Sequence, residues 1–359
     1  LPNTSFRGPE ALWVRWDPAQ NPERRDPALR TAQRDFPIGA PESRAIVRRV
    51  SVARAAPEAE GILGVTLVDP AGGRLPAWSP GAHLDLVLPS GESRKYSLCG
   101  PADSGEWRLA VLCEPEGRGG SRWVHEAVRE GVELHVRGPR NHFRLDEGAE
   151  SYLLIAGGIG ITPIIAMADR LKALGKPYEL HYAGRGRDTM AFLARLERDH
   201  GAALRLYPGA EGVRLDLAAL LAEPRQEQLI YACGPERLLD ALAEGTAHWP
   251  EGSLHVEHFS AEGTALDPER EHAFEVVLAD SDLTLSVPRD RTLLQSLRAA
   301  GIDVPSDCEE GLCGSCEVAV LDGEIDHRDK VLTASEREGQ GRLMSCCSRA
   351  RGKRLVLGL

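Results

Sequence analysis

The chain has 359 residues, of which 42% are hydrophobic and 27% are charged, and it carries a formal net charge of −11 at pH 7. That length predicts two or three domains, each able to bury its own core. The negative charge argues against nucleic acid and against an anionic membrane surface as partners, because both bind clustered lysine and arginine. No apolar run reaches the roughly 18 residues that a membrane-spanning helix needs.

Residues 1–44 differ from the rest of the chain in their composition and residue pattern. The stretch SFRGPEALWVRW has strand character, and the polar, proline-rich stretch that follows it is typical of a linker. The first residue is leucine rather than methionine. We therefore expect residues 1–44 to be the end of a preceding domain followed by a linker.

Residues 45–150 predict an antiparallel β-barrel. Short alternating runs such as GILGVTLVDP and GVELHVRG are separated by glycine and proline at the turns. One amphipathic stretch, SRWVHEAVREG, predicts a helix with Ser121 as its N-cap and Gly131 as its stop signal. Many short strands with a single helix are typical of a small barrel.

After residue 150 the pattern changes to strands that alternate with helices. Residues 151–261 therefore predict an α/β domain with a parallel sheet and crossover helices. Residues 262–272 are a second linker candidate. Residues 273–359 contain two hairpin-like strand pairs around the helical stretch TLLQSLRAAGI, which predicts an α+β domain of the β-grasp type. The whole chain is thus expected to be multidomain.

The eight cysteines are unevenly distributed along the chain. Cys99, Cys113 and Cys233 stand alone, whereas the other five lie at or beyond Cys308. The opening residues do not have the pattern of a signal peptide, so we expect a cytoplasmic protein. In that compartment clustered cysteines indicate metal or redox chemistry rather than a disulfide framework.

The cysteine spacing predicts a plant-type [2Fe–2S] cluster. Cys308, Cys313 and Cys316 follow the pattern C-x4-C-x2-C, and a distant cysteine near position 346 would complete the set. A loop that wraps a small cluster must curve tightly, and glycines inside this loop allow that curvature. Structural zinc is a weaker alternative because it usually takes two short cysteine pairs. Disulfides are the other alternative.

Two adjacent cysteines compete for the fourth position. Cys346 and Cys347 are neighbours, and neighbouring side chains in a strand point to opposite faces of the sheet. Only one of the two is therefore expected to reach the cluster. The residues themselves do not decide which one it is.

A glycine-rich turn in LLIAGGIGITPI predicts a nucleotide-phosphate site. Gly158 and Gly160 lie between a buried strand and a helix, whose N-terminus offers free N–H groups to a pyrophosphate. We expect Thr162 to cap this helix and Pro163 to occupy its first turn. The turn YACGPERLL repeats the arrangement at a later strand end, although a Gly-Pro turn of this kind is also common without a ligand.

Two further stretches predict a flavin site on the barrel. The strand RKYSL offers Arg94 for a phosphate, Tyr96 for stacking and Ser97 for a hydrogen bond to a ring edge. The stretch GRGGSRWVHE leads through glycines into a helix N-terminus, which is typical of an anion site. Taken singly, each of these stretches is also compatible with an edge strand or a flexible loop.

Together these motifs resemble the phthalate dioxygenase reductase family over residues 45–359. The resemblance rests on RKYSL, GRGGSRWVHE, GPRNHFRL, AGGIGITPI, YACGPERLL and SDCEEGLCGSCEVAVLDGEIDHRDKVLT with MSCCSRA, in the family's order of flavin barrel, nicotinamide domain and ferredoxin. It implies FMN, a nicotinamide cofactor and a [2Fe–2S] cluster. It also makes Cys346, rather than Cys347, the fourth cluster ligand.

The resemblance assigns the cofactor contacts residue by residue. The implied flavin contacts are Arg94, Tyr96, Ser97, Leu98, Gly119, Gly120 and Ser121. The implied nicotinamide contacts are Gly158, Gly160, Thr162, Pro163, Cys233, Gly234 and Pro235. The implied catalytic residues are Ser97, Cys233 and Phe259, the last as an aromatic near the flavin. The implied metal ligands are Cys308, Cys313, Cys316 and Cys346.

The choice of nicotinamide cofactor depends on a strand end. In YELHYAGRGRD the cations Arg185 and Arg187 precede Asp188, and cations suit the 2′-phosphate of NADPH, whereas NADH prefers a carboxylate on its ribose. We expect NADPH, with NADH as a possible second donor. A basic loop exposed to solvent is the simpler explanation for the same residues.

The stretch SFRGPEALWVRWDP resembles the end of a bacterial cytochrome P-450 haem domain, and the whole chain is similar to the reductase half of self-sufficient P-450 fusions. This resemblance implies electron flow from NADPH through FMN and [2Fe–2S] to a haem domain in the same polypeptide. One alternative is a stand-alone reductase for a Rieske dioxygenase or O-demethylase. Another is a redox-sensing iron–sulfur module without turnover.

The segment around the cysteine loop is strongly acidic. Residues 303–326 contain several aspartates and glutamates but no lysine or arginine. Such a rim could steer a basic face of the haem domain toward the cluster. An ordinary solvated acidic surface is the competing interpretation.

Overall fold

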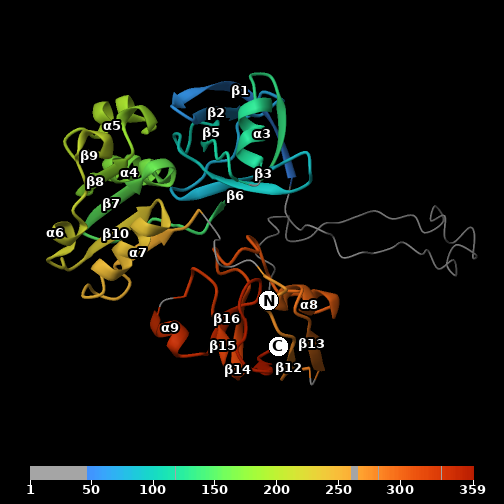
Figure 1. Ribbon diagram of the computed structural model, residues 1–359. Coiled ribbons are helices and arrows are strands. Elements are labelled where there is room, and N and C mark those ends of the chain that lie inside the picture. Colours follow the sequence, from blue (N-terminus) through green and yellow to red (C-terminus); the bar gives the residue numbers. More distant parts are fainter. Residues whose placement is uncertain (1–46, 118, 260–265, 282, 333) are drawn as a thin grey trace, which may run out of the picture. The chain divides into compact units, whose positions relative to one another are not determined.

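The computed structural model describes residues 47–117, 119–259, 266–281, 283–332 and 334–359 (Figure 1). The expected domain remnant and linker at residues 1–44 lie outside these ranges, as does much of the second linker candidate. Within them, three larger sheets follow one another along the chain. One buried apolar cluster belongs to the first sheet and one to the third, while another combines residues of the first and second sheets.

The first sheet is a six-stranded antiparallel sheet in the order β4-β3-β6-β1-β2-β5. Its strands are β1 (Val47–Ala59), β2 (Ile62–Val68), β3 (Ala82–Val87), β4 (Ser93–Ser97), β5 (Trp107–Leu112) and β6 (Glu133–Asn141). The two end strands approach each other just after β4, where the Cys99 N–H donates to the Arg108 carbonyl at 3.0 Å. The sheet thereby curls into a barrel around buried side chains such as Leu84 and Trp107. One helix, α3 (Gly120–Ala127), lies against it.

The second sheet is parallel throughout, in the order β11-β10-β7-β8-β9. Its strands are β7 (Ser151–Gly157), β8 (Tyr178–Gly184), β9 (Leu204–Pro208), β10 (Gln228–Cys233) and β11 (Leu254–Glu257). The connecting helices are α4 (Ile161–Leu174), α5 (Leu193–His200), α6 (Leu217–Leu221) and α7 (Glu236–Gly245). The central strands β7 and β10 are almost entirely buried, as expected of strands covered on both faces. Their carboxyl ends therefore lie side by side.

The third sheet belongs to the cysteine-rich region and has the order β13-β12-β18-β14-β16. Its strands are β12 (Phe274–Leu278), β13 (Leu283–Val287), β14 (Glu317–Asp322), β16 (Arg342–Met344) and β18 (Arg354–Leu357), with β15 (Ile325–Asp326) and β17 (Arg349–Ala350) as a separate pair. The parallel pair β12 and β18 lies between antiparallel neighbours. The helices are α8 (Leu293–Ala299) and α9 (Ala334–Glu338). Thr292 and Gln295 form a capping box that begins α8.

Both predicted N-caps are wrong, and so is the predicted stop at Gly131, because helix α3 ends at Ala127. Helix α3 begins at Gly120, two residues earlier than an N-cap at Ser121 implies, so Ser121 lies inside it and its Oγ accepts a hydrogen bond from the Glu114 N–H at 3.0 Å. Helix α4 has Gly160 at its N-cap, and the Thr162 hydroxyl donates to the Ile159 carbonyl at 3.0 Å instead. In both cases a glycine turn already sets the entry angle, so the hydroxyl is free to bond a neighbouring loop or turn.

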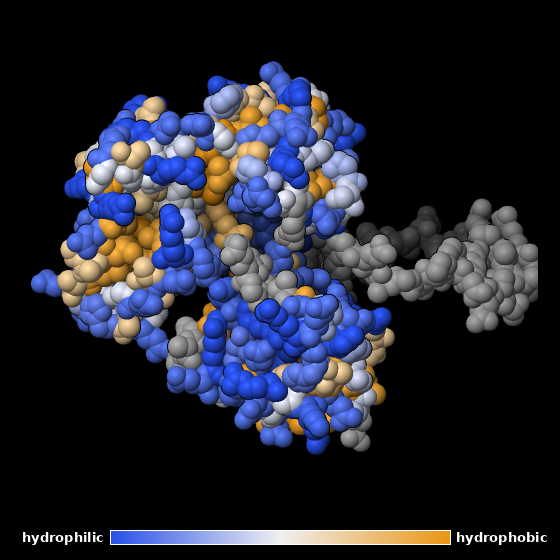
Figure 2. All heavy atoms as spheres, viewed as in Figure 1, coloured by the Kyte–Doolittle hydropathy of each residue, from blue (hydrophilic) through white to orange (hydrophobic). Residues whose placement is uncertain are grey.

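In the part of the chain that the structure describes, no helix combines the length and hydropathy needed to cross a membrane. On the face shown in Figure 2, apolar side chains form separate patches among hydrophilic ones. The larger exposed apolar residues, such as Leu321 and Val213, belong to different sheets or loops.

Candidate redox sites

The loop between α8 and β14 holds the first three cysteines of the predicted cluster site. Two backbone N–H groups point at the Cys308 sulfur, from Glu310 at 3.4 Å and from Leu312 at 3.3 Å. Gly311 and Gly314 have φ values of 74° and 77°, a left-handed conformation that favours glycine. The loop thus curls its N–H groups toward the sulfurs, as a site for an anionic cluster requires.

The thiols of this loop converge on a cysteine from the segment after β16. Cys308 contacts both Cys313 and Cys346, and Cys316 also contacts Cys346. The neighbouring Cys347 thiol lies 3.8 Å from the Met344 carbonyl, to which it is directed. All eight cysteines are free thiols. The four thiols therefore fit a [2Fe–2S] cluster with Cys346, and not Cys347, in the fourth position.

The predicted phosphate site on the barrel is built from β4 and the start of α3. A Cβ at Gly120 would lie 2.8 Å from the Arg94 side chain, so glycine lets this arginine cross the helix N-terminus. Gly119, with φ of 82°, forms the turn into the helix. The Arg94 guanidinium is bonded to Glu92 at 2.8 Å and its side chain is only 15% exposed. A cation held beside a helix N-terminus fits a terminal phosphate group.

Two glycine turns meet at the carboxyl ends of β7 and β10. A Cβ on Gly160 would lie 2.2 Å from the Cys233 carbonyl oxygen, and a Cβ on Gly234 would lie 3.0 Å from the Gly157 Cα. Glycine is therefore required on both sides of this contact. Pro163 is buried in the first turn of α4. The two turns form one surface of backbone groups at the strand ends, the usual place for a nucleotide in such a sheet.

Ser97 and Cys233 come together through a residue that the sequence reasoning missed. Glu257 ends β11, directly beside Cys233 in the parallel register, and its carboxyl group accepts a hydrogen bond from Ser97. Ser97 is 5% exposed, and Cys233 is fully buried. Burial raises the pKa of the Cys233 thiol well above its usual value, so it stays neutral. The site thus joins β4 of the barrel to the turn after β10 of the parallel sheet.

Glu257 is the most perturbed carboxyl group of this site. Its Oε2 is buried and has no hydrogen-bond partner in the described part of the chain, although the residue as a whole is partly exposed. Burial raises its pKa to about 8, against smaller opposing effects of the Ser97 hydrogen bond and the Lys95 charge. The signal was available in the sequence: the carboxyl ends of neighbouring parallel strands meet at one edge, and the glutamate of VEHF lies at the end of the last strand.

The other predicted flavin contacts are placed differently. Tyr96 is partly buried, and burial raises its pKa to about 12. The Leu98 side chain is fully buried in the barrel core, which leaves only its backbone for a contact with a cofactor. Phe259 is 45% exposed just beyond β11. Among the described residues, no hydrogen bond or aromatic ring contact joins Phe259 to Ser97 or Cys233.

The two arginines of the predicted NADPH site differ in their surroundings. Arg187 forms ion pairs with Glu197 at 3.1 Å and with Glu211 at 3.2 Å. Arg185 is exposed at the end of β8, and among the described residues its side chain has no ion-pair partner. Arg185 is therefore the more available cation.

The acidic segment at residues 303–326 is partly neutralised within the chain. Glu309 pairs with Arg298 at 2.8 Å, and Glu317 pairs with Arg342 at 3.7 Å. Asp307 pairs with Arg140, and Asp326 pairs with Arg328 at 2.6 Å. Many of the acidic side chains that were expected to face an outside partner therefore form ion pairs with arginines of the same chain.

Comparison with known proteins identifies the cysteine-rich region first. Residues 276–351 match the model of the 2Fe-2S iron-sulfur cluster binding domain. Over 324 residues the chain is 36% identical to phthalate dioxygenase reductase from Burkholderia cepacia, covering 87% of this chain and 97% of that protein. A solved structure of phthalate dioxygenase reductase superposes with a TM-score of 0.63 at 36% identity, covering 87% of this chain and 98% of the other.

Two further comparisons point to oxygenase systems. The chain is 42% identical over 303 residues to phenoxybenzoate dioxygenase subunit beta from Ectopseudomonas oleovorans, covering 84% of this chain and 94% of that protein. Full-length CYP116B46 from Tepidiphilus thermophilus matches with a TM-score of 0.82 and 53% identity over 99% of this chain. The chain spans only 47% of that structure.

Proposed function

The chain belongs to the phthalate dioxygenase reductase family and is an electron-transfer reductase with a [2Fe–2S] domain, and from this premise we propose that it passes electrons from NADPH through FMN and the cluster to a cytochrome P-450 haem domain. The division that supports this scheme is a flavin barrel at residues 45–150, a nicotinamide domain at 151–261 and a ferredoxin domain at 273–359. The nicotinamide supplies a hydride, the flavin divides its two electrons, and the cluster carries them singly.

The observation that carries the proposal is the convergence of Ser97, Glu257 and Cys233. These residues join the strand that would hold the flavin ring to the turn that would hold the nicotinamide. Burial raises the pKa of both the Glu257 carboxyl and the Cys233 thiol, which favours their uncharged forms where the two rings would meet. The chain's role in this step is to align the rings and exclude water, and no general base is needed.

The choice of FMN rests on the phosphate site beside β4. Arg94 and the start of α3 offer one compact cation and one helix N-terminus, which suits a single terminal phosphate. NADPH as the donor rests on Arg185 and Arg187 at the end of β8. In the cluster loop, Cys308, Cys313, Cys316 and Cys346 would bind the irons, while backbone N–H groups would bond the sulfurs.

A haem domain as the acceptor is supported by the fusion proteins. The P-450 fusion CYP116B46 contains a region similar to 99% of this chain. A second solved structure, an intact type IV self-sufficient cytochrome P450 monooxygenase, matches at 57% identity over 100% of this chain, which again spans 47% of it.

Purified chain, its cofactors and a separate haem domain test the proposal directly. Cofactor analysis should give FMN rather than FAD, with two irons and two sulfides per chain for a [2Fe–2S] cluster. Under anaerobic conditions NADPH should bleach the flavin band first and the cluster band second. With carbon monoxide present, the P-450 haem should then show its reduced spectrum. If NADPH leaves the flavin oxidised, the proposed electron path is wrong.

A second candidate acceptor is the oxygenase component of a Rieske-type dioxygenase or O-demethylase. Phenoxybenzoate dioxygenase subunit beta and vanillate O-demethylase oxidoreductase from a Pseudomonas strain are similar to this chain at 42% and 40% identity. Both candidates use the same cofactor chain, so only the acceptor separates them. Faster oxidation of the reduced cluster by a Rieske oxygenase than by the haem domain would favour this second candidate.

A further inference from the structure

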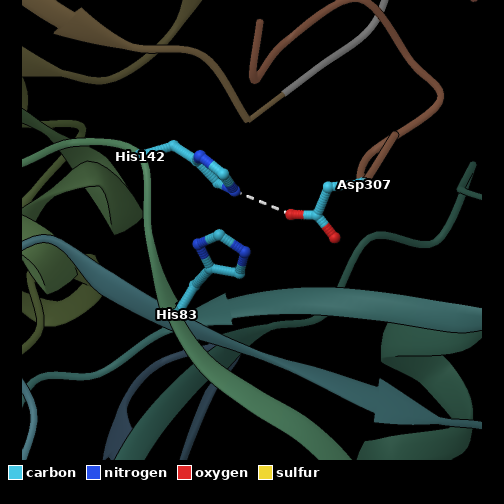
Figure 3. Close-up of side chains that lie close together, drawn as sticks. All are labelled: His83, His142 and Asp307. Atoms are coloured by element: carbon cyan, nitrogen blue, oxygen red, sulfur yellow. Dashed lines mark hydrogen bonds and ion pairs between the residues drawn. The ribbon is translucent and has the colours of Figure 1, made fainter. Parts of the chain in front are cut away.

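Asp307, the residue directly before the cluster cysteine Cys308, is bound by the flavin barrel. Its carboxylate pairs with Arg140 near the end of β6. It also accepts a hydrogen bond at 2.7 Å from Nε2 of His142, the residue directly after β6 (Figure 3). Lys95 Nζ lies 4.0 Å from the same carboxylate. The Asp307 side chain is only 9% exposed, so this acidic group faces the barrel and not the solvent.

Other barrel residues hold the groups that bind Asp307 in place. Asp85 on β3 is 5% exposed and holds both cations, Arg140 at 2.9 Å and Lys95 at 3.0 Å. The His142 ring packs against the His83 ring, with 5.6 Å between their centroids. Because these groups are fixed by their own neighbours, little side-chain freedom is lost when the carboxylate binds. Lys95 also precedes the flavin strand residues Tyr96 and Ser97.

A second contact anchors the other side of the cluster loop. The Lys330 backbone N–H donates to the Gly311 carbonyl inside that loop at 2.9 Å. Its ammonium group pairs with Glu236, the first residue of α7, at 2.8 Å. Glu236 in turn accepts from His258 at 3.1 Å. The cluster loop is therefore tied to the barrel through Asp307 and to the nicotinamide-binding sheet through Lys330.

We propose that Asp307 and Lys330 are positioning residues that dock the cluster loop in the geometry for electron transfer from the flavin. The inference rests on the proposed function and names the residues that serve its internal step. With both cofactors bound, a reduced flavin would give its two electrons to the cluster one at a time, the second after the acceptor has reoxidised the cluster. Cys308, Cys313, Cys316 and Cys346 would hold that cluster. Asp307 and Lys330 act through the cluster loop and touch no reacting atom.

The same side chains are a poorer fit for a divalent cation. His83, His142 and Asp307 have ligand atoms within 4.8 Å of one another. Arg140 and Lys95 already neutralise Asp307, however, and a bound metal ion would have to displace or repel both cations. The ion pairs account for the arrangement without a metal.

The central test compares Asp307→Asn with Glu309→Gln. The two acidic residues flank Cys308, so either variant removes one negative charge at a similar distance from the cluster. Only Asp307 contacts the barrel, because Glu309 pairs with Arg298 at 2.8 Å. Anaerobic stopped-flow mixing with NADPH would follow the flavin band and then the cluster band. Asp307→Asn should slow cluster reduction by about tenfold, while flavin reduction and ferricyanide turnover stay near wild type. Glu309→Gln should be near wild type throughout.

Hydrogen exchange supplies a readout that is independent of turnover. In Asp307→Asn, the barrel peptide containing Arg140 and His142 should exchange faster, although it is remote in sequence from the mutation. Charge reversal tests the second contact: Lys330→Glu should slow cluster reduction, and adding Glu236→Lys should restore part of the rate. A merely structural role for Lys330 would not be rescued in this way.

The outcomes separate the inference from the proposed function. Equal cluster-reduction rates and equal exchange in wild type and Asp307→Asn would overturn the docking role. If the rate of cluster reduction falls as much in Glu309→Gln as in Asp307→Asn, the docking role is also overturned, because the loss of one negative charge would explain both results. If NADPH fails to reduce the flavin of the wild-type chain, the proposed function fails, yet the exchange measurement still decides whether Asp307 docks the loop.

Discussion

Glu257 and Ser97 share a hydrogen bond although they belong to two different sheets. The contact places a carboxyl group, with a pKa raised by burial to about 8, beside the strand that carries the flavin motif. Near neutral pH the group is protonated and uncharged. Its buried Oε2 has no partner within the described residues. Buried polar atoms are seldom left without partners, which marks this position as a site for a cofactor group.

The first prediction concerns protein stability as a function of pH. A carboxyl group whose pKa is raised on folding stabilises the folded chain below its unfolded pKa, near 4.5, and this contribution is lost as the pH rises through about 8. Between pH 6 and pH 9 the Tm of wild type should therefore fall more steeply than that of Glu257→Gln, by roughly a few degrees. Thermal unfolding followed by circular dichroism measures the difference.

Glu251→Gln is the matched control for this prediction. Glu251 lies in the exposed turn before β11, so its removal should leave the pH dependence unchanged. Parallel Tm curves for wild type and Glu257→Gln would show that the Glu257 carboxyl titrates near its ordinary value.

Motifs with fixed spacing made the cofactor sites predictable. A cluster loop needs thiolates at set intervals, so Cys308, Cys313 and Cys316 identify it from sequence alone. Alternating and helical apolar patterns likewise identified the antiparallel, parallel and β-grasp regions, because each pattern follows from which face is buried. Glycine turns such as that at Gly160 indicated where nucleotide would bind.

Contacts between distant segments were not predictable. Nothing in the local sequence of Asp307 indicates that it meets Arg140, so its charge was assigned to a surface for an outside partner. The buried state of Leu98 and the ion pairs of Arg187 also depend on the packing of remote elements. Glu257 lies between these cases: a parallel sheet was predicted, but the strand order and register that place Glu257 beside Cys233 were not.

The second prediction separates the adjacent cysteines. Cys346→Ser should lose most of the iron and sulfide, because the Cys346 thiol is the one that contacts Cys308 and Cys316. Cys347→Ser should keep the cluster, with a small loss of stability from a polar group in the core. Iron and sulfide analysis, together with the visible spectrum, gives the answer. Ferricyanide reduction should survive in both variants, since the flavin can supply it. Cluster loss in Cys347→Ser alone would reverse the assignment.

The third prediction tests the contact between the two glycine turns. Gly160→Ala would place a methyl group 2.2 Å from the Cys233 carbonyl, and the backbones must separate to accept it. We expect a cost of about 3 kcal/mol in unfolding free energy and a markedly higher KM for NADPH. Gly175→Ala is the control, because that helix end has a φ of 66° but no atom within 4 Å of the added methyl group. It should cost only about 1 kcal/mol and leave KM unchanged. If Gly160→Ala and Gly175→Ala change the KM for NADPH equally, the contact between the glycine turns has no role in nucleotide binding.

The fourth prediction concerns the choice between NADPH and NADH. Arg185 has no ion-pair partner among the described side chains, whereas Arg187 is balanced by Glu197 and Glu211. Arg185→Ala should therefore lower kcat/KM for NADPH by about tenfold, the effect of losing one charged hydrogen bond, and leave NADH nearly unchanged. Arg187→Ala should lower the NADPH to NADH ratio by a smaller factor, because this arginine must leave its glutamates to bind a phosphate. Arg198→Ala, on the exposed face of α5, serves as the control for a general change in surface charge. If the ratio of kcat/KM for NADPH to that for NADH is unchanged in both Arg185→Ala and Arg187→Ala, the end of β8 does not belong to the cofactor site.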